Sequence, residues 1–260
     1  MPDSKDFDFA DEGGWTLGRF AALKSGGLVH AVTTRCGLDV GRVKLEPAWA
    51  AGRLAERLGL QQAAWLDQIH GGDVLSVLSG GLAGQGDGLV TARRGLGLVG
   101  RSADCPLILL ADEASGVAGM AHASWRGTVR MIAARLVEAA ANLGGSRERM
   151  IACICPSAGP CCYEVGRDVL EAAVGGIGPE ARNFFVPRGD KFVLDLWSAN
   201  RRQLELAGIE PGNIHIAGVC TLCRNDIFPS HRKEGASAGR FMAVIGLAVR
   251  ADKGGVAWRP

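Results

Sequence analysis

The amino-acid sequence predicts a mixed α/β (α+β) fold, with helices covering a mixed β-sheet in an α/β/α arrangement. Two observations support this prediction. Short runs of β-branched and apolar residues recur along the chain, and amphipathic helical patterns separate only some of them. No linker-like or low-complexity segment divides the 260 residues, and this length suits one large domain. We therefore expect a single domain over residues 1–260.

Ten segments have the composition of strands, because apolar and β-branched residues fill short runs between turn-forming residues. They are Leu28–Thr34, Ala63–Ile69, Val74–Leu78, Leu96–Val99, Leu107–Leu110, Val117–Ala121, Met150–Ile154, Phe192–Leu194, Ile214–Ala217 and Phe241–Ala248. Helical patterns separate only some of these runs, which favours a mixed sheet over a repeated strand–helix–strand unit.

Four segments show helical periodicity. The clearest is Val129–Leu143, in which apolar residues recur every three or four positions and so share one face. Thr128 is placed to cap this helix and Gly144 to end it. Three further helices are expected at Trp49–Leu58, Arg167–Val174 and Leu196–Ala207. The Gly-rich segment Gly80–Gly88 is predicted to be a loop.

Charge and hydropathy exclude several classes of protein. With a formal net charge of only +2, the chain lacks the basic surface that nucleic-acid binding requires. The acidic start, Met1–Glu12, does not have the basic and apolar regions of a signal peptide. No apolar run approaches the roughly 18 residues that span a membrane. We therefore expect a cytoplasmic protein without nucleic-acid or membrane partners, whose eight cysteines are reduced or bind metal.

Three residues with metal-binding side chains are expected at strand ends. His70 and His122, two of only five histidines, each close a predicted strand, and Cys105 lies just before another. Two imidazoles and one thiolate suit zinc, which keeps its fourth position open when the protein supplies three ligands. The three residues are therefore candidates for a catalytic zinc site. Their spacing matches no local zinc motif, so a buried thiol beside two hydrogen-bonded histidines is an equal alternative.

Two further groups of residues invite a binding role. Arg126 stands just before the predicted helix Val129–Leu143, where free backbone N–H groups favour a phosphate, but it also suits a surface ion pair. The adjacent Cys161 and Cys162, together with Cys220 and Cys223, suggest a second metal site. A structural zinc site usually uses two well-spaced pairs, so buried reduced thiols are favoured here. The remaining histidines, His30, His215 and His231, are interpreted as structural or surface residues.

Eight motifs are distributed over most of the chain. They are Gln68–Gly71, Gly86–Thr91, Ala103–Pro106, Ala121–Thr128, Pro156–Val165, Asp195–Trp197, Cys220–Thr221 and Ser230–Arg232. In this order they resemble the YfiH/YlmD-type family, which also carries the names laccase domain and polyphenol oxidase.

The resemblance implies a zinc ion held by His70, Cys105 and His122, which would also form the catalytic centre. It implies a YfiH-like layered fold and phosphorolysis of adenosine, inosine or guanosine, and methylthioadenosine. Adenosine deamination is a further activity of the family, and some members are tied to the editing of peptidoglycan precursors. We therefore expect a purine nucleoside and phosphate as ligands, with Arg126 and Arg35 binding the phosphate.

The laccase name can be tested by counting histidines. A multicopper oxidase needs many imidazoles beyond the two that a blue-copper centre takes, and the chain has five in all. Copper would instead substitute for zinc, because its intrinsic affinity for such ligands is higher.

Two other classes of function stay open. Cys105 as nucleophile and His122 as base would make a thiol hydrolase, which suits peptidoglycan editing. A non-enzymatic, zinc-stabilised binding protein is the other alternative. Deamination would require an acid–base carboxylate, for which Asp87 and Asp104 are nearest in sequence. Residues 36–46 depart from the family pattern, so substrate preference does not follow from the resemblance.

Overall fold

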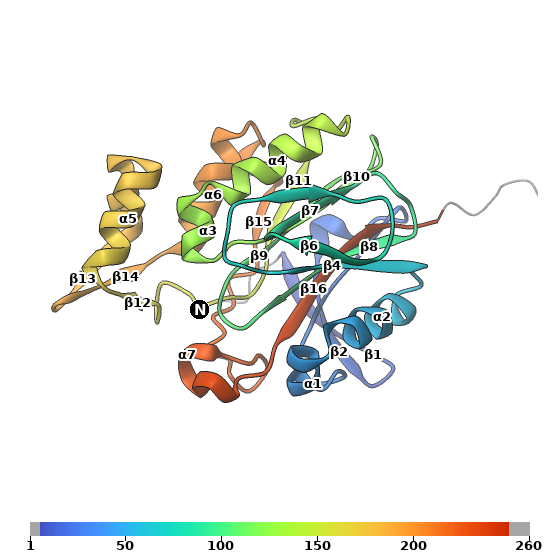
Figure 1. Ribbon diagram of the computed structural model, residues 1–260, viewed down its shortest axis with the longest axis horizontal. Coiled ribbons are helices and arrows are strands. Elements are labelled where there is room, and N and C mark those ends of the chain that lie inside the picture. Colours follow the sequence, from blue (N-terminus) through green and yellow to red (C-terminus); the bar gives the residue numbers. More distant parts are fainter. Residues whose placement is uncertain (1–5, 250–260) are drawn as a thin grey trace, which may run out of the picture.

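Two β-sheets stacked face to face form the centre of the protein (Figure 1), whose computed structural model describes residues 6–249. Residues 1–5 of the acidic start and residues 250–260 lie outside this range. The first sheet contains, in spatial order, β1 (Phe7–Glu12), β2 (Trp15–Phe20), β3 (Leu28–Thr33), β16 (Phe241–Leu247), β8 (Leu96–Ser102), β4 (Gln62–Asp67) and β6 (Gly81–Gln85). The second contains β15 (Ile214–Ile216), β11 (Ile151–Ile154), β9 (Leu107–Asp112), β10 (Val117–His122), β7 (Gly88–Thr91) and β5 (Val74–Ser76).

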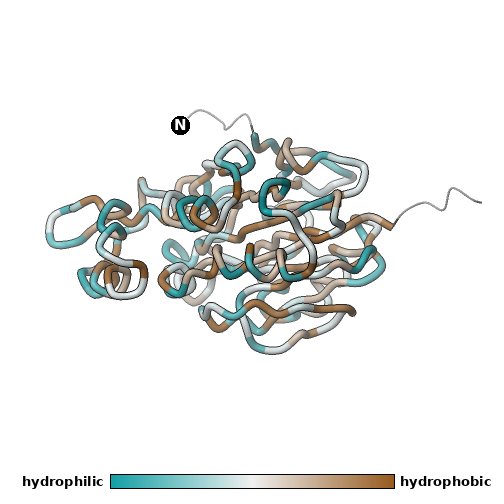
Figure 2. The backbone as a smooth tube through the Cα atoms, turned by 90° about the horizontal axis from the view of Figure 1, so that it is seen from above, coloured by the Kyte–Doolittle hydropathy of each residue, from teal (hydrophilic) through white to brown (hydrophobic). Residues whose placement is uncertain are grey.

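The main hydrophobic core lies between these two sheets. Leu98 and Phe241 of the first sheet and Leu109 and Met120 of the second belong to one buried cluster. Hydrophobic residues are concentrated in the central strands, and polar residues are more frequent in the outer turns and helices (Figure 2). Burial of this apolar surface is the main force that holds the sheets together.

Helices cover the outer face of each sheet. The helix α2 (Pro47–Arg57) buries Leu54 against the first sheet. On the second sheet lie α4 (Ile132–Asn142) and α6 (Leu196–Leu206), with Leu136 and Leu204 in a second cluster. The layers are therefore α/β/β/α, and the predicted mixed α/β fold is confirmed. The central β-layer is double because β9, β10 and β16 are buried on both faces and need a sheet on one side and helices on the other.

A smaller unit projects from the side of the two sheets (Figure 1). It contains a three-stranded sheet of β12 (Glu164–Val165), β14 (Lys191–Leu194) and β13 (Phe185–Arg188), covered by α5 (Arg167–Ile177). Leu170 and Phe185 belong to its own hydrophobic cluster. The remaining short helices are η1 (Ala21–Leu23), α1 (Val40–Leu45), α3 (Trp125–Val129), η2 (Pro179–Phe184), η3 (Pro211–Asn213), α7 (His231–Glu234) and η4 (Gly235–Ser237).

All ten predicted strand segments coincide with strands, and three of the four predicted helices are continuous helices. The fourth, Val129–Leu143, corresponds to α4, which begins only at Ile132. The first residue of the predicted segment, Val129, ends the separate helix α3, and Met131, with φ 62°, lies between the two helices. The loop predicted over Gly80–Gly88 is wrong, since β6 occupies most of it as an edge strand. Within residues 6–249, no helix has the length and apolar character needed to cross a membrane.

Candidate metal centre

Three side chains from different parts of the chain converge at one end of the second sheet. The ligand atoms of His70, Cys105 and His122 all lie within 4.8 Å of one another. His122 is the last residue of β10 and pairs in register with Leu107, the first residue of β9. Antiparallel pairing therefore brings Cys105, just before β9, to the same end of the sheet. The fold brings together the three residues that the sequence singled out, and their role as ligands stays a prediction.

The backbone beside two of these residues is strained. His70 lies in the connection from β4 to β5, which crosses from the first sheet to the second, and has φ 59°. Asp104, the neighbour of Cys105, has φ 90°. Non-glycine residues rarely adopt such conformations, which persist where the surrounding structure enforces them and often occur at functional sites.

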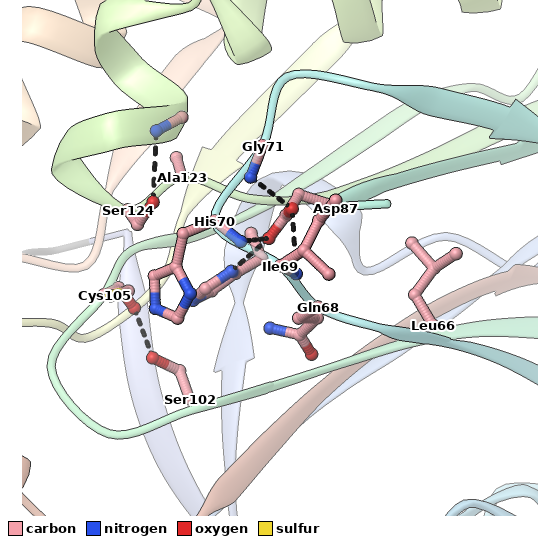
Figure 3. A network of polar contacts seen from close by, with 12 residues as sticks. Leu66, Gln68, Ile69, His70, Gly71, Asp87, Ser102, Cys105, Ala123 and Ser124 are labelled. Atoms are coloured by element: carbon pink, nitrogen blue, oxygen red, sulfur yellow. Dashed lines mark hydrogen bonds and ion pairs between the residues drawn. The ribbon is translucent and has the colours of Figure 1, made fainter. Parts of the chain in front are cut away.

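The buried carboxylate of Asp87 holds two of the candidate ligands. One oxygen accepts hydrogen bonds from Nδ1 of His122 at 2.7 Å and from the N–H of His70 at 3.1 Å. The other accepts from the N–H groups of Ile69 at 3.2 Å and Gly71 at 2.6 Å (Figure 3). Because Nδ1 of His122 is committed to Asp87, its Nε2 is left for a metal.

The charges of Cys105 and His122 depend on each other. Burial acts to raise the pKa of the Cys105 thiol, but the charge of His122 and hydrogen bonds from His122 and His70 lower it overall. Burial acts to lower the pKa of His122, but the Cys105 charge and the bond to Asp87 raise it overall. The surroundings therefore favour a thiolate, the form of cysteine that binds metals and acts as a nucleophile.

Hydrogen bonds also fix the segment that carries Cys105. Ser102 Oγ donates to the Cys105 carbonyl at 2.7 Å. The Asp104 carboxylate accepts from Thr221 Oγ1 and from the Arg232 N–H, both at 2.7 Å. Neither Asp104 nor Asp87, which the sequence offered as acid–base groups, lines the pocket described next.

A pocket of about 400 Å³ opens onto the three candidate ligands. Its other lining residues are Lys44, Gln68, Arg101, Ser102, Ala103, His231 and Arg240. The Gln68 amide donates to the Arg101 carbonyl at 2.8 Å and accepts from the Arg101 N–H at 2.9 Å. The buried Nε of Arg101 has no hydrogen-bond partner among the described residues. Burial lowers the pKa of this guanidinium, so an anion in the pocket would stabilise it.

The pocket has a strongly cationic wall. Lys44 and Arg240 join Arg101 there, and no carboxylate is among the described residues that line it. Lys44 comes from the segment 36–46, which therefore contributes directly to the pocket. These three cations could not be recognised from the sequence, because they come from distant parts of the chain. The only local signal was Arg101, a charged residue near the end of the apolar strand β8.

The two arginines that the sequence assigned to phosphate do not line this pocket. Arg35 forms an ion pair with Glu234 at 2.6 Å and donates to the Asn225 carbonyl at 2.9 Å, so it ties two loops together. Arg126 lies over the ring of Trp125 and lines a second pocket, of about 320 Å³, which also borders His70. The role of both residues in phosphate binding stays a prediction.

Known proteins share the fold of this chain and a large part of its sequence. The family model described as "Multi-copper polyphenol oxidoreductase laccase" matches residues 29–248. The chain belongs to this family, which includes the YfiH and YlmD proteins.

Several relatives carry functional names. A Deinococcus radiodurans protein named purine nucleoside phosphorylase is 38% identical over 88% of this chain and 92% of its own. Purine nucleoside phosphorylase YlmD of Geobacillus stearothermophilus is 32% identical over 90% of this chain and 86% of its own. Its crystal structure superposes with a TM-score of 0.78 and 30% identity over 95% of this chain and all of that one. Adenosine deaminase RL5, from an unknown prokaryote, is 37% identical over 59% of each chain.

Proposed function

We propose that this protein is a zinc-dependent purine nucleoside phosphorylase whose substrates bind in the pocket beside His70, Cys105 and His122. The names of its relatives support the reaction class. The observation that carries the proposal is the presence, in one pocket, of the three candidate metal ligands and the half-buried guanidinium groups of Arg101 and Arg240. A volume of about 400 Å³ falls within the range of small-molecule sites.

The donor set fits zinc. Two imidazoles and a thiolate, with Asp87 orienting one imidazole, match a three-ligand zinc site that leaves one position for substrate or water. Zinc bound there supplies a Lewis acid that polarises a nearby substrate group. Copper would use the same three residues. Five histidines cannot hold the several copper ions that the family description names.

The cationic wall suits the phosphate. Arg101, Arg240 and Lys44 would hold it by charge-assisted hydrogen bonds. A phosphate oxygen then attacks the anomeric carbon of the ribose and forms a carbon–oxygen bond. The bond from that carbon to the purine nitrogen breaks, and its electron pair leaves with the purine, which takes up a proton. Adenosine, inosine and guanosine give ribose 1-phosphate and the free base. Methylthioadenosine gives the methylthio analogue of ribose 1-phosphate and the free base.

Deamination and thiol hydrolysis are the competing activities. The name of the RL5 relative favours deamination, but zinc deaminases use a carboxylate as acid and base, and none of the described residues that line the pocket supplies one. The lowered pKa of Cys105 beside His122 favours a thiol hydrolase. Incubation of pure protein with adenosine, with and without phosphate, distinguishes phosphorolysis from deamination. Adenine formed only with phosphate supports the proposal, whereas inosine formed without phosphate contradicts it.

Zinc dependence is tested separately by chelation followed by zinc addition. The chelated protein should lose nucleoside turnover and regain it with zinc. Full turnover in zinc-free protein would instead support Cys105 as a nucleophile. Loss of thermal stability without any turnover in either form would indicate a binding protein.

Arg240→Ala provides a sharper test of the phosphate position. We expect the KM for phosphate to rise about 10- to 100-fold, the effect of losing hydrogen bonds to a charged group, while the nucleoside KM changes little. Arg126→Ala tests the rival phosphate position, because Arg126 lines the second pocket. A rise in phosphate KM only for Arg126→Ala would move the phosphate to that second pocket.

A further inference from the structure

Four cysteine side chains form a second cluster, apart from the candidate catalytic centre. The sulfur atoms of Cys161, Cys162, Cys220 and Cys223 all lie within 4.8 Å of one another. The Sγ of Cys223 is 3.6 Å from that of Cys161 and 3.5 Å from that of Cys162. None of the four is in a disulfide, and neither pocket that borders His70 includes them.

The sheet topology explains why two distant pairs meet. The strands β11 and β15 are parallel neighbours, so their carboxyl ends point the same way and the loops that follow them run side by side. Ser157 of one loop exchanges backbone hydrogen bonds with the other. It donates to the Val219 carbonyl at 3.2 Å and accepts from the Thr221 N–H at 3.0 Å. Cys161 and Cys162 follow in the first loop, and Cys220 lies in the second.

A tight turn lets the adjacent Cys161 and Cys162 face the same centre. In an extended strand, neighbouring side chains point to opposite faces. Here the N–H groups of Cys162 and Tyr163 both donate to the Gly159 carbonyl at 3.0 Å, so the chain turns at this point. Adjacent cysteines do not form a spaced pair, which made buried reduced thiols the favoured prediction. This turn instead allows both side chains to face one metal ion.

The sulfur separations match a single tetrahedral ion. Four zinc–sulfur bonds of about 2.3 Å place the sulfurs about 3.8 Å apart. An iron–sulfur cluster distributes the four thiolates over two or four irons, which spreads the sulfurs more widely. A disulfide would join only two of the four and would require about 2.05 Å. The Gly159 N–H also donates to Sγ of Cys220 at 3.3 Å, an interaction that stabilises a thiolate.

We propose that Cys161, Cys162, Cys220 and Cys223 bind one structural zinc ion with four-coordinate, closed geometry. The ion would fasten together the loops that follow β11 and β15. Thr221, next to Cys220, donates to the Asp104 carboxylate, and Asp104 precedes Cys105. The Ala158 N–H, in the other loop, donates to the Asp104 carbonyl at 2.8 Å. The structural zinc therefore supports the backbone behind the candidate catalytic cysteine without contacting substrate.

Metal content tests this proposal directly. The full-length protein is purified under reducing, anaerobic conditions from zinc-supplemented cells, and zinc and iron per chain are measured by mass spectrometry. Cys162→Ser/Cys223→Ser should contain one zinc fewer than the unsubstituted protein. Cys36→Ser is the matched control, because Cys36 is exposed and outside both clusters, and it should leave the zinc content unchanged. Equal zinc in the double variant and the unsubstituted protein would overturn the proposal.

A third variant separates this proposal from the proposed function. His70→Ala/His122→Ala removes two candidate catalytic ligands and should retain the structural zinc. If the catalytic triad binds no zinc, the unsubstituted protein holds one zinc, and the cysteine double variant holds none. With cobalt in place of zinc, the histidine double variant should show the absorption of a multi-thiolate tetrahedral site, which the cysteine double variant should lack.

Cys223→Ser and Cys223→His distinguish metal loss from misfolding. The serine variant should lose the zinc and melt about 5–10 °C lower. The histidine variant should keep the zinc, because histidine is also a zinc ligand and position 223 is exposed. Zinc loss in both variants with unchanged melting temperature would contradict a structural role. Iron in equimolar amount, or a disulfide between these cysteines in the anaerobic protein, would overturn the assignment to zinc.

Discussion

At the candidate metal centre, the buried carboxylate of Asp87 contacts both histidine-bearing segments. Its two oxygens accept hydrogen bonds from four N–H groups, one on the His122 ring and three on the backbone of residues 69–71. Because all four partners are N–H donors, residue 87 must act as the acceptor in each contact. Burial acts to raise the pKa of Asp87, but the bonds to His122 and to the Gly71 N–H lower it overall, which keeps the carboxylate ionised.

Asp87→Asn should weaken zinc binding about 10- to 100-fold, the usual effect of removing a partner of a metal-binding histidine. The amide supplies only one acceptor, and its NH₂ group would face donors that Asp87 accepts. Zinc affinity is measured by competition with a chromogenic chelator, with Asp73→Asn as control. Asp73 is exposed and lines the second pocket. Unchanged affinity in Asp87→Asn would show that the carboxylate does not position the ligands.

Sequence reasoning found some residues of the site and missed others for a physical reason. The sequence alone pointed to His70, Cys105 and His122. Histidines are scarce in the chain, and each of the three residues stands next to the end of a predicted strand, which is a local property. Arg101 and Arg240 gain their importance only from meeting in one pocket, which depends on the pairing of β8 with β16. No local pattern encodes that meeting.

Among the elements, the short helix α3 packs unusually close to the loop that carries His70. A Cβ atom on Gly127 would lie 2.9 Å from the Gly71 carbonyl oxygen and 3.4 Å from that of His122. Both are backbone atoms, which cannot move aside as a flexible side chain can. Gly127 therefore permits an approach that any other residue would prevent.

Gly127→Ala should lower the free energy of unfolding by about 1–3 kcal/mol, the usual cost of overpacking. It should also weaken zinc binding, because α3 would displace the Gly71 loop. Gly52→Ala is the matched control: Gly52 is exposed within α2, and its added methyl would meet nothing within 4 Å. The control should gain about 0.5–1 kcal/mol, since alanine favours a helix. Both changes are measured by urea denaturation, and equal effects would contradict the packing argument.

Strands were predictable from the sequence where consecutive residues are all buried. Strands such as β9 and β16 are buried throughout, and their apolar runs mark them directly. The separation of α4 from α3 at Met131 was not predictable, because the apolar spacing of Val129 and Ile132 continues across it.

At the scale of the whole molecule, the two large sheets share one core. Polar groups buried within the sheets must therefore form their hydrogen bonds with other groups of the protein. His30, in β3, is buried, and its Nε2 accepts a hydrogen bond from the Phe20 N–H at 2.9 Å. The ring must be neutral to accept this bond. Burial, reinforced by the charges of Arg19 and Lys24, lowers the pKa of His30 to about 4.

This lowered pKa predicts a loss of stability in mild acid. Below pH 6.5 the unfolded chain takes a proton on His30, whereas the folded protein takes it only near pH 4. Between these values the unfolded state binds more protons, so the free energy of unfolding falls as the pH falls, by about 3 kcal/mol at pH 4. His30→Gln has no such titration. Urea denaturation of both proteins at pH 7 and pH 4, with chelator present so that metal release adds nothing, should show a smaller decrease for His30→Gln. Equal decreases would place the acid sensitivity in other groups.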